Sequence, residues 1–350
     1  MFMYVGTYTT TQHGRAEGIH VFRFDPKTGE LAPVQTMSPV ADPSFLVLDA
    51  EQRFLYAVNE RGEGTVSAFA RNPESGELRF INSQSSHGAD PCQLSIDATG
   101  KYVLVANYSS GTVAALPVAG DGSLEAASSV VQHEGSSVIS DRQAGPHTHM
   151  IAPTPEGQSI LVTDLGTDEV VIYRLDGGTG QLMREGAFLV EPGSGPRHFA
   201  FSPNGLNLYV INELSSTLSV FAYDAEKLAF PQLQSVSTLP DYFGGENSCA
   251  HVVVSPDGRY VYGSNRGHDS IAIWSVGEVA GEVSRVDIVP AGGEEPRNFA
   301  IDPTGGWLLA ANQKSDTIVT FQRDQETGML TPEDVPATVP TPVCIVFGGE

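Results

Sequence analysis

The chain has 350 residues, of which 40% are apolar and 17% are charged. This balance is typical of a globular protein and excludes a disordered chain, a collagen and a coiled coil. No run of residues approaches the roughly 18 apolar positions of a membrane-spanning helix, which argues against a membrane protein. The formal net charge of −23 disfavours nucleic acid and anionic membranes as partners, so an anionic ligand would have to bind where the few arginines gather.

The start of the chain and its cysteines indicate the compartment. The first residues show neither the basic segment nor the apolar core of a secretion signal. Cys92, Cys249 and Cys344 are odd in number and far apart, so we expect neither a disulfide framework nor a zinc site of paired cysteines. We expect a cytoplasmic protein that uses no metal and no cofactor.

The first predicted element, residues 2–5, has the composition of a short strand. After it, a motif of small and apolar residues recurs seven times, 46 to 55 residues apart. The first residues of the seven copies, here called anchors, are Pro43, Pro91, Pro146, Pro196, Cys249, Pro296 and Pro342. A fixed period of this length indicates one structural unit that is built repeatedly.

Each repeat has the pattern of four short strands. A turn follows the first strand, as at residues 202–205 and 302–305, with Asp or Ser first and Gly fourth, as type I turns prefer. A second β-rich run follows, as at 102–106, and then a third that alternates apolar and polar residues, as at 217–221. Another turn precedes the fourth strand, and no stretch of similar length has helical spacing. The pattern predicts an all-β fold, a seven-bladed β-propeller.

The two ends of the chain are expected to share one blade. The seventh repeat supplies only a first strand, and residues 2–5 resemble a second strand. Pairing of the two ends would close the ring and cover both open sheet edges. Residues 1–350 are therefore predicted to form a single domain.

In such a blade the first strand lines the central channel and the second strand runs antiparallel beside it. The start of the first strand and the end of the second strand therefore lie at the same rim of the channel. Asn or Asp stands 16 positions after the anchor in most repeats; the count is 18 in the third, which we attribute to a longer turn. These residues are Asn59, Asn107, Asp164, Asn212, Asn265 and Asn312. Because they repeat, we interpret them as caps of the next turn. Asn265 is also a candidate for substrate binding.

Residues that differ between repeats are better candidates for binding, because a small asymmetric ligand needs different groups from different blades. The candidates at the predicted rim are Tyr8, Arg197, Glu213, Arg266, Arg297 and Gln313. An arginine presents a planar fork of donors that matches carboxylate or phosphate. The alternative is that these arginines form structural ion pairs with Glu60 and Glu213. Their gathering in an acidic protein favours anion binding.

Two histidines of the third repeat, His147 and His149, are spaced to point to the same face of a strand. This spacing is compatible with a metal site, but no third ligand with comparable placement is evident. We interpret His149 as a packed core residue and His147 as the candidate at the rim.

These motifs together resemble the lactonase family of seven-bladed propellers. The family includes the bacterial 6-phosphogluconolactonase type and the carboxymuconate cyclase type. The resemblance runs from residue 2 to about 347 and is most specific in Ser-Asn-Arg-Gly-His-Asp at 264–269 and Pro-Arg-Asn-Phe at 296–299. It implies an active-site group of one histidine, two arginines and one glutamate. Matched by motif, these are His147, Arg197, Glu213 and Arg266. His251 stands where relatives often carry an acidic residue.

The resemblance implies a carboxylic-ester hydrolase that opens the lactone of a sugar acid, above all 6-phosphogluconolactone. Such an enzyme belongs to carbohydrate metabolism, in the pentose phosphate pathway. The reaction needs a base for water, donors for an oxyanion and an anchor for the anionic tail. Either Glu213 or His147 is expected to be the base. Arg197 and Arg266 are expected to bind the phosphate and the developing oxyanion. Further candidates for substrate binding are Arg142, Arg297, Gln313, Asn265 and Tyr8.

Three alternatives stay open. A carboxymuconate-type cyclase or isomerase would also bind an anion through arginines. A non-catalytic propeller would serve as a scaffold for protein partners, because fold does not fix function. A calcium-dependent sugar lactonase would lose its activity to a chelator.

Overall fold

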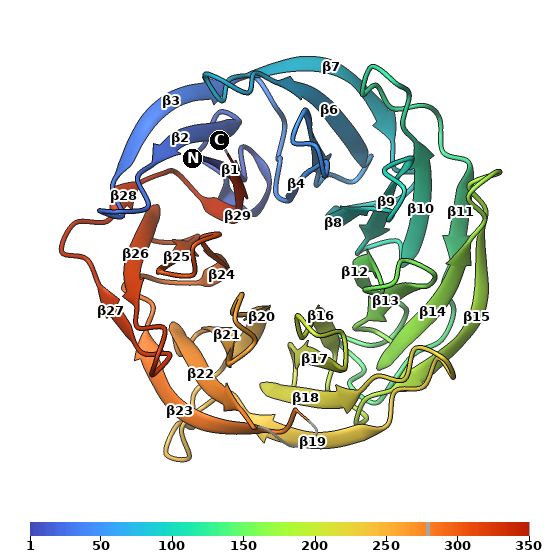
Figure 1. Cartoon of the computed structure of the whole chain (residues 1–350). Coiled ribbons are helices and arrows are strands. Elements are labelled where there is room, and N and C mark those ends of the chain that lie inside the picture. The colour runs from blue at the N-terminus through green and yellow to red at the C-terminus, as the bar shows by residue number, and fades with distance from the viewer. Residues whose placement is uncertain (278–280, 350) are drawn as a thin grey trace.

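Seven sheets stand as blades around a central channel (Figure 1). The computed structural model describes residues 1–277 and 281–349. The predicted all-β, seven-bladed propeller is confirmed, and in these two ranges the one helical segment is a 3-10 turn, η1 (Thr11–His13). None of the described residues belongs to a helix with the length and apolar character that crossing a membrane requires.

The strands of the first four blades follow one another from the channel outwards. Blade 1 consists of β4 (Leu46–Leu48), β5 (Phe54–Asn59), β6 (Thr65–Arg71) and β7 (Leu78–Ser85). Blade 2 consists of β8 (Pro91–Ile96), β9 (Tyr102–Asn107), β10 (Thr112–Pro117) and β11 (Ser129–Gln132). Blade 3 consists of β12 (Thr148–Pro153), β13 (Ile160–Asp164), β14 (Glu169–Leu175) and β15 (Leu182–Leu189). Blade 4 consists of β16 (Pro196–Phe201), β17 (Asn207–Asn212), β18 (Thr217–Ala222) and β19 (Gln232–Ser237).

The remaining blades complete the ring. Blade 5 consists of β20 (Ser248–Val254), β21 (Tyr260–Arg266), β22 (Ser270–Val276) and β23 (Val283–Pro290). Blade 6 consists of β24 (Pro296–Ile301), β25 (Trp307–Asn312), β26 (Thr317–Arg323), β27 (Leu330–Pro332) and β28 (Ala337–Thr338), the last two both paired with β26. Blade 7 consists of β29 (Pro342–Gly348), β1 (Phe2–Thr7), β2 (Ile19–Phe24) and β3 (Leu31–Met37).

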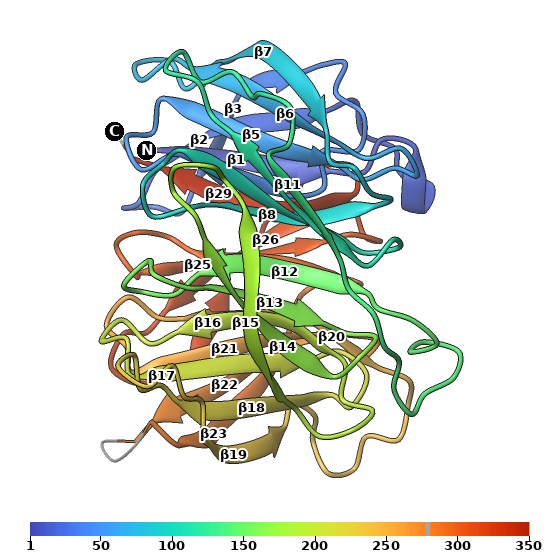
Figure 2. The same cartoon turned by 90° about the vertical axis from the view of Figure 1, so that its right-hand side faces the viewer.

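The ring closes in blade 7, where the C-terminal β29 pairs with the N-terminal β1 and Phe2 lies opposite Gly348. The two chain ends lie side by side in both views (Figures 1 and 2). Arg71 of blade 1 fastens this closure, because its Nε donates to the Tyr4 hydroxyl at 2.7 Å and its Nη2 to the Gly349 carbonyl at 2.8 Å. The predicted pairing of the chain ends is confirmed.

Apolar side chains fill the spaces between neighbouring blades. Between blades 4 and 5, for example, Tyr209 and Ile211 pack with Val261 and Trp274, and all four are fully buried. Burial of apolar surface is the main stabilising contribution in folding, so the blades form a rigid support for the residues at the channel.

The repeated Asn is structural, although its partners differ from the expected ones. Asn107 Nδ2 donates to the Ser86 carbonyl and to Thr112 Oγ1, both at 3.1 Å. Asn265 Nδ2 donates to the Thr238 carbonyl at 3.0 Å. These two amides join the end of the second strand to the loop that enters the blade. Asn212 Nδ2 donates instead to Thr217 and Ser219 of the third strand, and Asp164 caps the next turn as expected, because its Oδ1 accepts from the Gly166 N–H at 3.0 Å.

The third blade corrects the predicted alignment of the repeats. Thr148, and not Pro146, pairs with Asp164 across the two inner strands. The next turn spans residues 154–157 and closes with the Gly157 N–H on the Thr154 carbonyl at 2.8 Å. It has the ordinary length, so the anchor of this repeat lies two residues later than predicted.

Candidate active site

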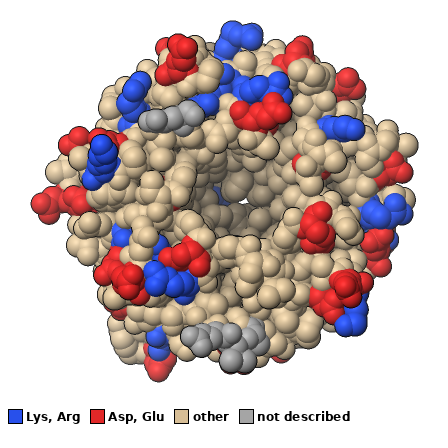
Figure 3. Space-filling model, viewed as in Figure 1, with Lys and Arg blue, Asp and Glu red and all other residues tan. Residues whose placement is uncertain are grey.

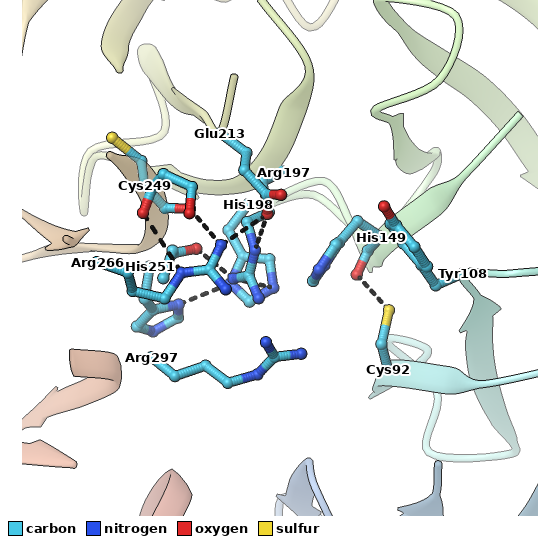
Figure 4. Close-up of polar contacts among 12 residues, drawn as sticks. Cys92, Tyr108, His149, Arg197, His198, Glu213, Cys249, His251, Arg266 and Arg297 are labelled. Carbon is cyan, nitrogen blue, oxygen red and sulfur yellow. Dashed lines mark hydrogen bonds and ion pairs between the residues drawn. The ribbon is translucent and has the colours of Figure 1, made fainter. Parts of the chain in front are cut away.

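At the start of the innermost strand of several blades, one residue is left out of the pairing with the second strand. In blade 4 the pairing skips from Pro196 to His198, and blades 2, 3 and 6 have the same irregularity. Such a β-bulge changes the direction of a side chain and is common beside active sites. The residues in these bulges are Cys92, His149, Arg197 and Arg297. Figure 4 shows the last three pointing toward the same central space.

Glu213, which follows β17, binds three guanidinium groups. Arg142 Nη2 donates to its Oε1 at 2.6 Å. Arg197 Nε and Arg266 Nη2 donate to its Oε2 at 2.9 and 2.8 Å (Figure 4). The three arginines come from the β11–β12 loop, from blade 4 and from blade 5, so the ring brings together residues that are far apart in the sequence.

Burial strengthens the electrostatics of this network. Arg197 is 1% exposed, and burial followed by the charges of Arg266 and Arg297 lowers its pKa to about 9, so it stays protonated at neutral pH. Burial alone would raise the pKa of Glu213, but Arg266 and Arg197 lower that pKa far below its usual range. Glu213 is therefore a firmly ionised carboxylate and a weak base.

His147 and His149 flank the side chain of Tyr108. The His147 ring stacks on it with centroids 4.6 Å apart, and the His149 ring meets it edge-on at 5.6 Å. His147 Nδ1 lies 3.0 Å from the Tyr108 carbonyl; a carbonyl only accepts, so Nδ1 carries a proton and Nε2 is the basic nitrogen of the neutral ring. The Tyr108 hydroxyl accepts a bond from Arg142 at 3.3 Å, which connects the histidines to the Glu213 network.

His149 is buried, as predicted, but it is not an apolar core residue. It is 4% exposed, and its Nδ1 has no hydrogen-bond partner among the described residues. Burial and then the charge of Arg197 hold its pKa well below the usual value, so the ring is neutral at pH 7. Because Thr148 is the true anchor, His149 takes in blade 3 the bulge position that Arg197 takes in blade 4.

A second cluster lies on the blades across the channel and is centred on Glu60. The Tyr8 hydroxyl donates to Glu60 Oε1 at 2.8 Å, and the Ser44 hydroxyl donates to Oε2. Arg297 Nη2 lies 3.8 Å from Glu60 Oε1. Burial raises the pKa of Glu60, opposed in part by Arg297, so the environments of Glu60 and Glu213 shift their pKa values in opposite directions.

The ion pairs that the sequence offered as the alternative are therefore present, but the charges do not cancel. Four guanidinium groups face two carboxylates, Glu60 and Glu213, which leaves two positive charges in excess. The four arginines are Arg142, Arg197, Arg266 and Arg297.

His251 forms part of a histidine pair deeper in the inner strands. The Nδ1 atoms of His198 and His251 are 2.7 Å apart, so one of them donates and the other accepts. Burial and then Arg197 lower the pKa of His251 to about 3, and the same two causes lower the pKa of His198 well below its usual value. The His251 ring is therefore neutral at pH 7.

The remaining candidates differ in their surroundings. Asn265 and Tyr8 are fully buried, and their side chains bond within the protein, so they hold neighbouring residues in place. Gln313 is 6% exposed, and its Oε1 has no hydrogen-bond partner in the described part of the chain. Across residues 1–277 and 281–349 no group of three or more His, Cys, Asp or Glu side chains is arranged to hold a metal ion.

A cavity of about 570 Å³ opens beside Glu213. The charged residues of its wall are Arg142, Glu213, Glu246, Arg266, Asp269, Glu294, Glu295 and Lys314. On the opposite face, which carries the chain ends, the central hollow is bordered mainly by uncharged residues (Figure 3). The mouth of the channel that contains the site is thus also the mouth with a charged cavity.

Sequence reasoning missed the place of His149 in the channel, and it did not select Tyr108. A signal for His149 was present, because the turn at 154–157 aligns with the turn at 202–205 without any insertion. That alignment puts His149, rather than His147, level with Arg197.

A closed ring of seven blades with four guanidinium groups and two carboxylates gathered at one mouth of its channel defines a β-propeller with a candidate site at that mouth. The chain belongs to the family described as Lactonase, 7-bladed beta-propeller, whose model matches residues 2–347. The predicted resemblance is confirmed.

Individual relatives are similar over nearly the whole chain. The chain is 39% identical to the 6-phosphogluconolactonase of Bacillus subtilis over 345 residues, which are 98% of this chain and 97% of the relative. It is 36% identical to the 6-phosphogluconolactonase of Formosa agariphila, with 94% of each chain covered. The solved structure of a periplasmic gluconolactonase of Pseudomonas aeruginosa superposes with a TM-score of 0.94 at 33% identity, covering 99% of both chains.

Proposed function

We propose that this protein hydrolyses the lactone ring of a sugar acid and that its substrate is 6-phosphogluconolactone. The observation that carries the proposal is the excess of positive charge in the cluster around Glu213 and Glu60, where four guanidinium groups face two carboxylates in a chain whose net charge is −23. A phosphate monoester carries about −1.5 to −2 charges at neutral pH, which matches this excess. The relatives named 6-phosphogluconolactonase support the same substrate.

We assign the base to the histidine pair His147 and His149. Glu213 is held ionised by three guanidinium groups, so it is a poor proton acceptor. His147 Nε2 and His149 Nδ1 make no hydrogen bond to a described residue. In the reaction, water adds to the carbonyl carbon and its proton passes to a histidine. The same histidine returns the proton to the ring oxygen as the C–O bond of the lactone breaks.

Arg266 and Arg142 are the proposed donors to the oxyanion of the tetrahedral intermediate. Both line the cavity beside Glu213, whereas Arg197 is buried behind it. Glu213 holds the three guanidinium groups in fixed directions, so they need little reorganisation when negative charge develops on the substrate. Arg197 and Glu213 therefore act together to position the donors.

The test is an assay of the purified protein with 6-phosphogluconolactone, gluconolactone and carboxymuconate, each with and without a chelator. We expect acid release from both lactones above the spontaneous rate, with the phosphorylated lactone preferred and no effect of the chelator. Loss of diene absorbance from carboxymuconate alone would favour the cyclase alternative, and loss of activity to the chelator would favour a calcium-dependent lactonase. No acceleration of any reaction would contradict an enzymatic role.

We also propose a cytoplasmic location. The three cysteines are buried free thiols, which fits a reducing compartment. The Pseudomonas aeruginosa structure is described as periplasmic, so the family is not confined to one compartment. Cell fractionation with compartment markers tests the proposal, and recovery outside the cytoplasmic fraction would contradict it.

A further inference from the structure

Arg297 differs from the other three arginines of the channel. The other three all donate hydrogen bonds to Glu213. Arg297 has one ion pair at 3.8 Å, to Glu60, and its guanidinium carbon lies 5.5 Å from the centre of the Tyr8 ring. It makes no hydrogen bond to any residue that the structure describes. Its donors are thus free for a ligand.

The neighbours of Arg297 explain why its N–H groups do not donate to Glu60. Both oxygens of Glu60 already accept hydroxyl donors, from Tyr8 and from Ser44. The Tyr8 ring supports the guanidinium from one side through a cation–π contact. Figure 4 shows the Arg297 side chain extending into the central space, in the direction of His149 and Cys92.

Gln313 gives a second, independent indication at the same place. Pro296 pairs with Asn312 across the two inner strands of blade 6, and the Gln313 N–H donates to the Glu295 carbonyl at 2.9 Å, so Arg297 and Gln313 lie on either side of this pair at the channel end of the blade. Gln313 is 6% exposed, and its Oε1 is buried without a partner in the described ranges. A buried polar atom without a protein partner costs free energy and often marks a functional position.

We propose that Arg297 and Gln313 form the subsite for the terminal phosphate of the substrate, across the channel from Glu213, and that Arg297 sets the preference for phosphorylated over unphosphorylated lactone. Arg297 binds the phosphate oxygens, and Gln313 accepts a hydroxyl of the adjoining sugar carbon. The substrate then spans the channel, with its lactone carbonyl near Arg266 and its tail at blade 6. This inference rests on the proposed function and adds the origin of its specificity.

The test compares Arg297→Met with the wild type on 6-phosphogluconolactone and gluconolactone. We expect the ratio of kcat/KM for the two lactones to fall at least about tenfold, through a higher KM for the phosphorylated one. Arg174→Met is the matched control, because Arg174 carries the same charge but is exposed and pairs with Glu185 on the outside of blade 3. The control should leave the ratio as in the wild type. An equal loss on both lactones, or no loss, would overturn the inference.

A binding measurement separates this inference from the proposed function. Calorimetric titration with 6-phosphogluconate and gluconate needs no turnover. We expect the wild type to bind 6-phosphogluconate at least about tenfold more tightly, a difference of about 1.4 kcal/mol, and Arg297→Met to lose this difference. If the protein hydrolyses neither lactone but shows this pattern, the subsite stands and the proposed function fails. Equal binding of the two acids by the wild type would overturn the subsite itself.

Arg297→Gln serves if the methionine variant does not fold, because its amide keeps a polar group beside Glu60. The expected loss of preference for 6-phosphogluconate is the same. A folded Arg297→Gln variant that keeps the full preference would also overturn the inference.

Discussion

Glu213 is the residue on which the site depends, because three guanidinium groups from separate parts of the chain bind its two oxygen atoms. One of these groups, that of Arg197, is almost completely buried. A buried charge that loses its partner is strongly destabilising, whereas exposed ion pairs contribute little. The residues of the site therefore also stabilise the folded protein.

We expect Glu213→Ala to lower the free energy of unfolding by about 3–5 kcal/mol, because Arg197 is left buried and unpaired. Glu185→Ala removes an exposed partner of Arg174 and should cost less than about 1 kcal/mol. Urea unfolding of both variants measures the two effects. Equal effects would show that the Glu213 network does not stabilise the protein.

The histidines carry the proposed proton transfer. Substitution of the base by Gln keeps a polar side chain but removes the proton acceptor, so we expect either His147→Gln or His149→Gln to lower kcat about a hundredfold or more. The variant with the larger loss identifies the base. Wild-type kcat in both variants would exclude the histidine pair from the mechanism.

At the scale of elements, the strands and turns of each blade were predictable because the same sequence pattern occurs in seven repeats. The register of blade 3 was predicted wrongly because Pro146 resembles an anchor two residues before Thr148, although the turn at 154–157 indicates the correct alignment. The contacts between Glu213 and the arginines also could not be derived from spacing. Arg142 belongs to an unpatterned loop, and its contact with Glu213 depends on how that loop crosses the channel mouth. Tertiary packing decides such contacts.

The inner strands β12, β16 and β20 carry the buried His149 and His198 and the half-buried His251, and these histidines make the stability of the fold depend on pH. In the unfolded chain an imidazole takes up a proton near pH 6.5. In the folded propeller, burial and the charge of Arg197 lower the pKa of His251 to about 3. The unfolded state therefore binds more protons between these two values, and stability falls as the pH falls from about 6.5 toward 3.

We expect His251→Gln to reduce the slope of this loss by up to about 1.4 kcal/mol per pH unit between pH 6 and 4, because one such histidine is removed. The amide of Gln can still bond to His198. Urea unfolding at several pH values measures the slope. A slope equal to that of the wild type would mean that His251 is not kept neutral by the fold.

At the scale of the whole molecule, the site exists only if the ring is closed. Glu213, its three arginine partners and the two histidines come from blades 3 to 5 and the loop before them, while Arg297 comes from blade 6 and Glu60 from blade 1. The pairing of β1 with β29 in blade 7 closes the ring between blades 6 and 1. The sequence predicts that residues 1–350 form a single domain, so we expect one cooperative unfolding transition.

A proline in the closing strand tests this dependence. Ile345 pairs with Val5 in β1, and its N–H donates to Asn298 Oδ1 at 2.9 Å, so Ile345→Pro should lower the free energy of unfolding by about 3 kcal/mol or more, which lowers Tm by about 4 °C or more in a chain of this length. Val286 lies at an irregularity of the outer strand β23, where Val286→Pro should lower Tm by less than about 1 °C. Similar shifts in both variants would show that closure contributes no special stability.

The central claim is that the mouth of the channel around Glu213 hydrolyses a lactone. Its most direct test is kcat/KM of Arg266→Ala with 6-phosphogluconolactone, compared with the wild type. This variant leaves Glu213 two of its three guanidinium partners, so the fold should persist. We predict a fall of at least about tenfold, equivalent to roughly 1.4 kcal/mol of transition-state stabilisation. A folded Arg266→Ala protein with the wild-type kcat/KM would contradict the account.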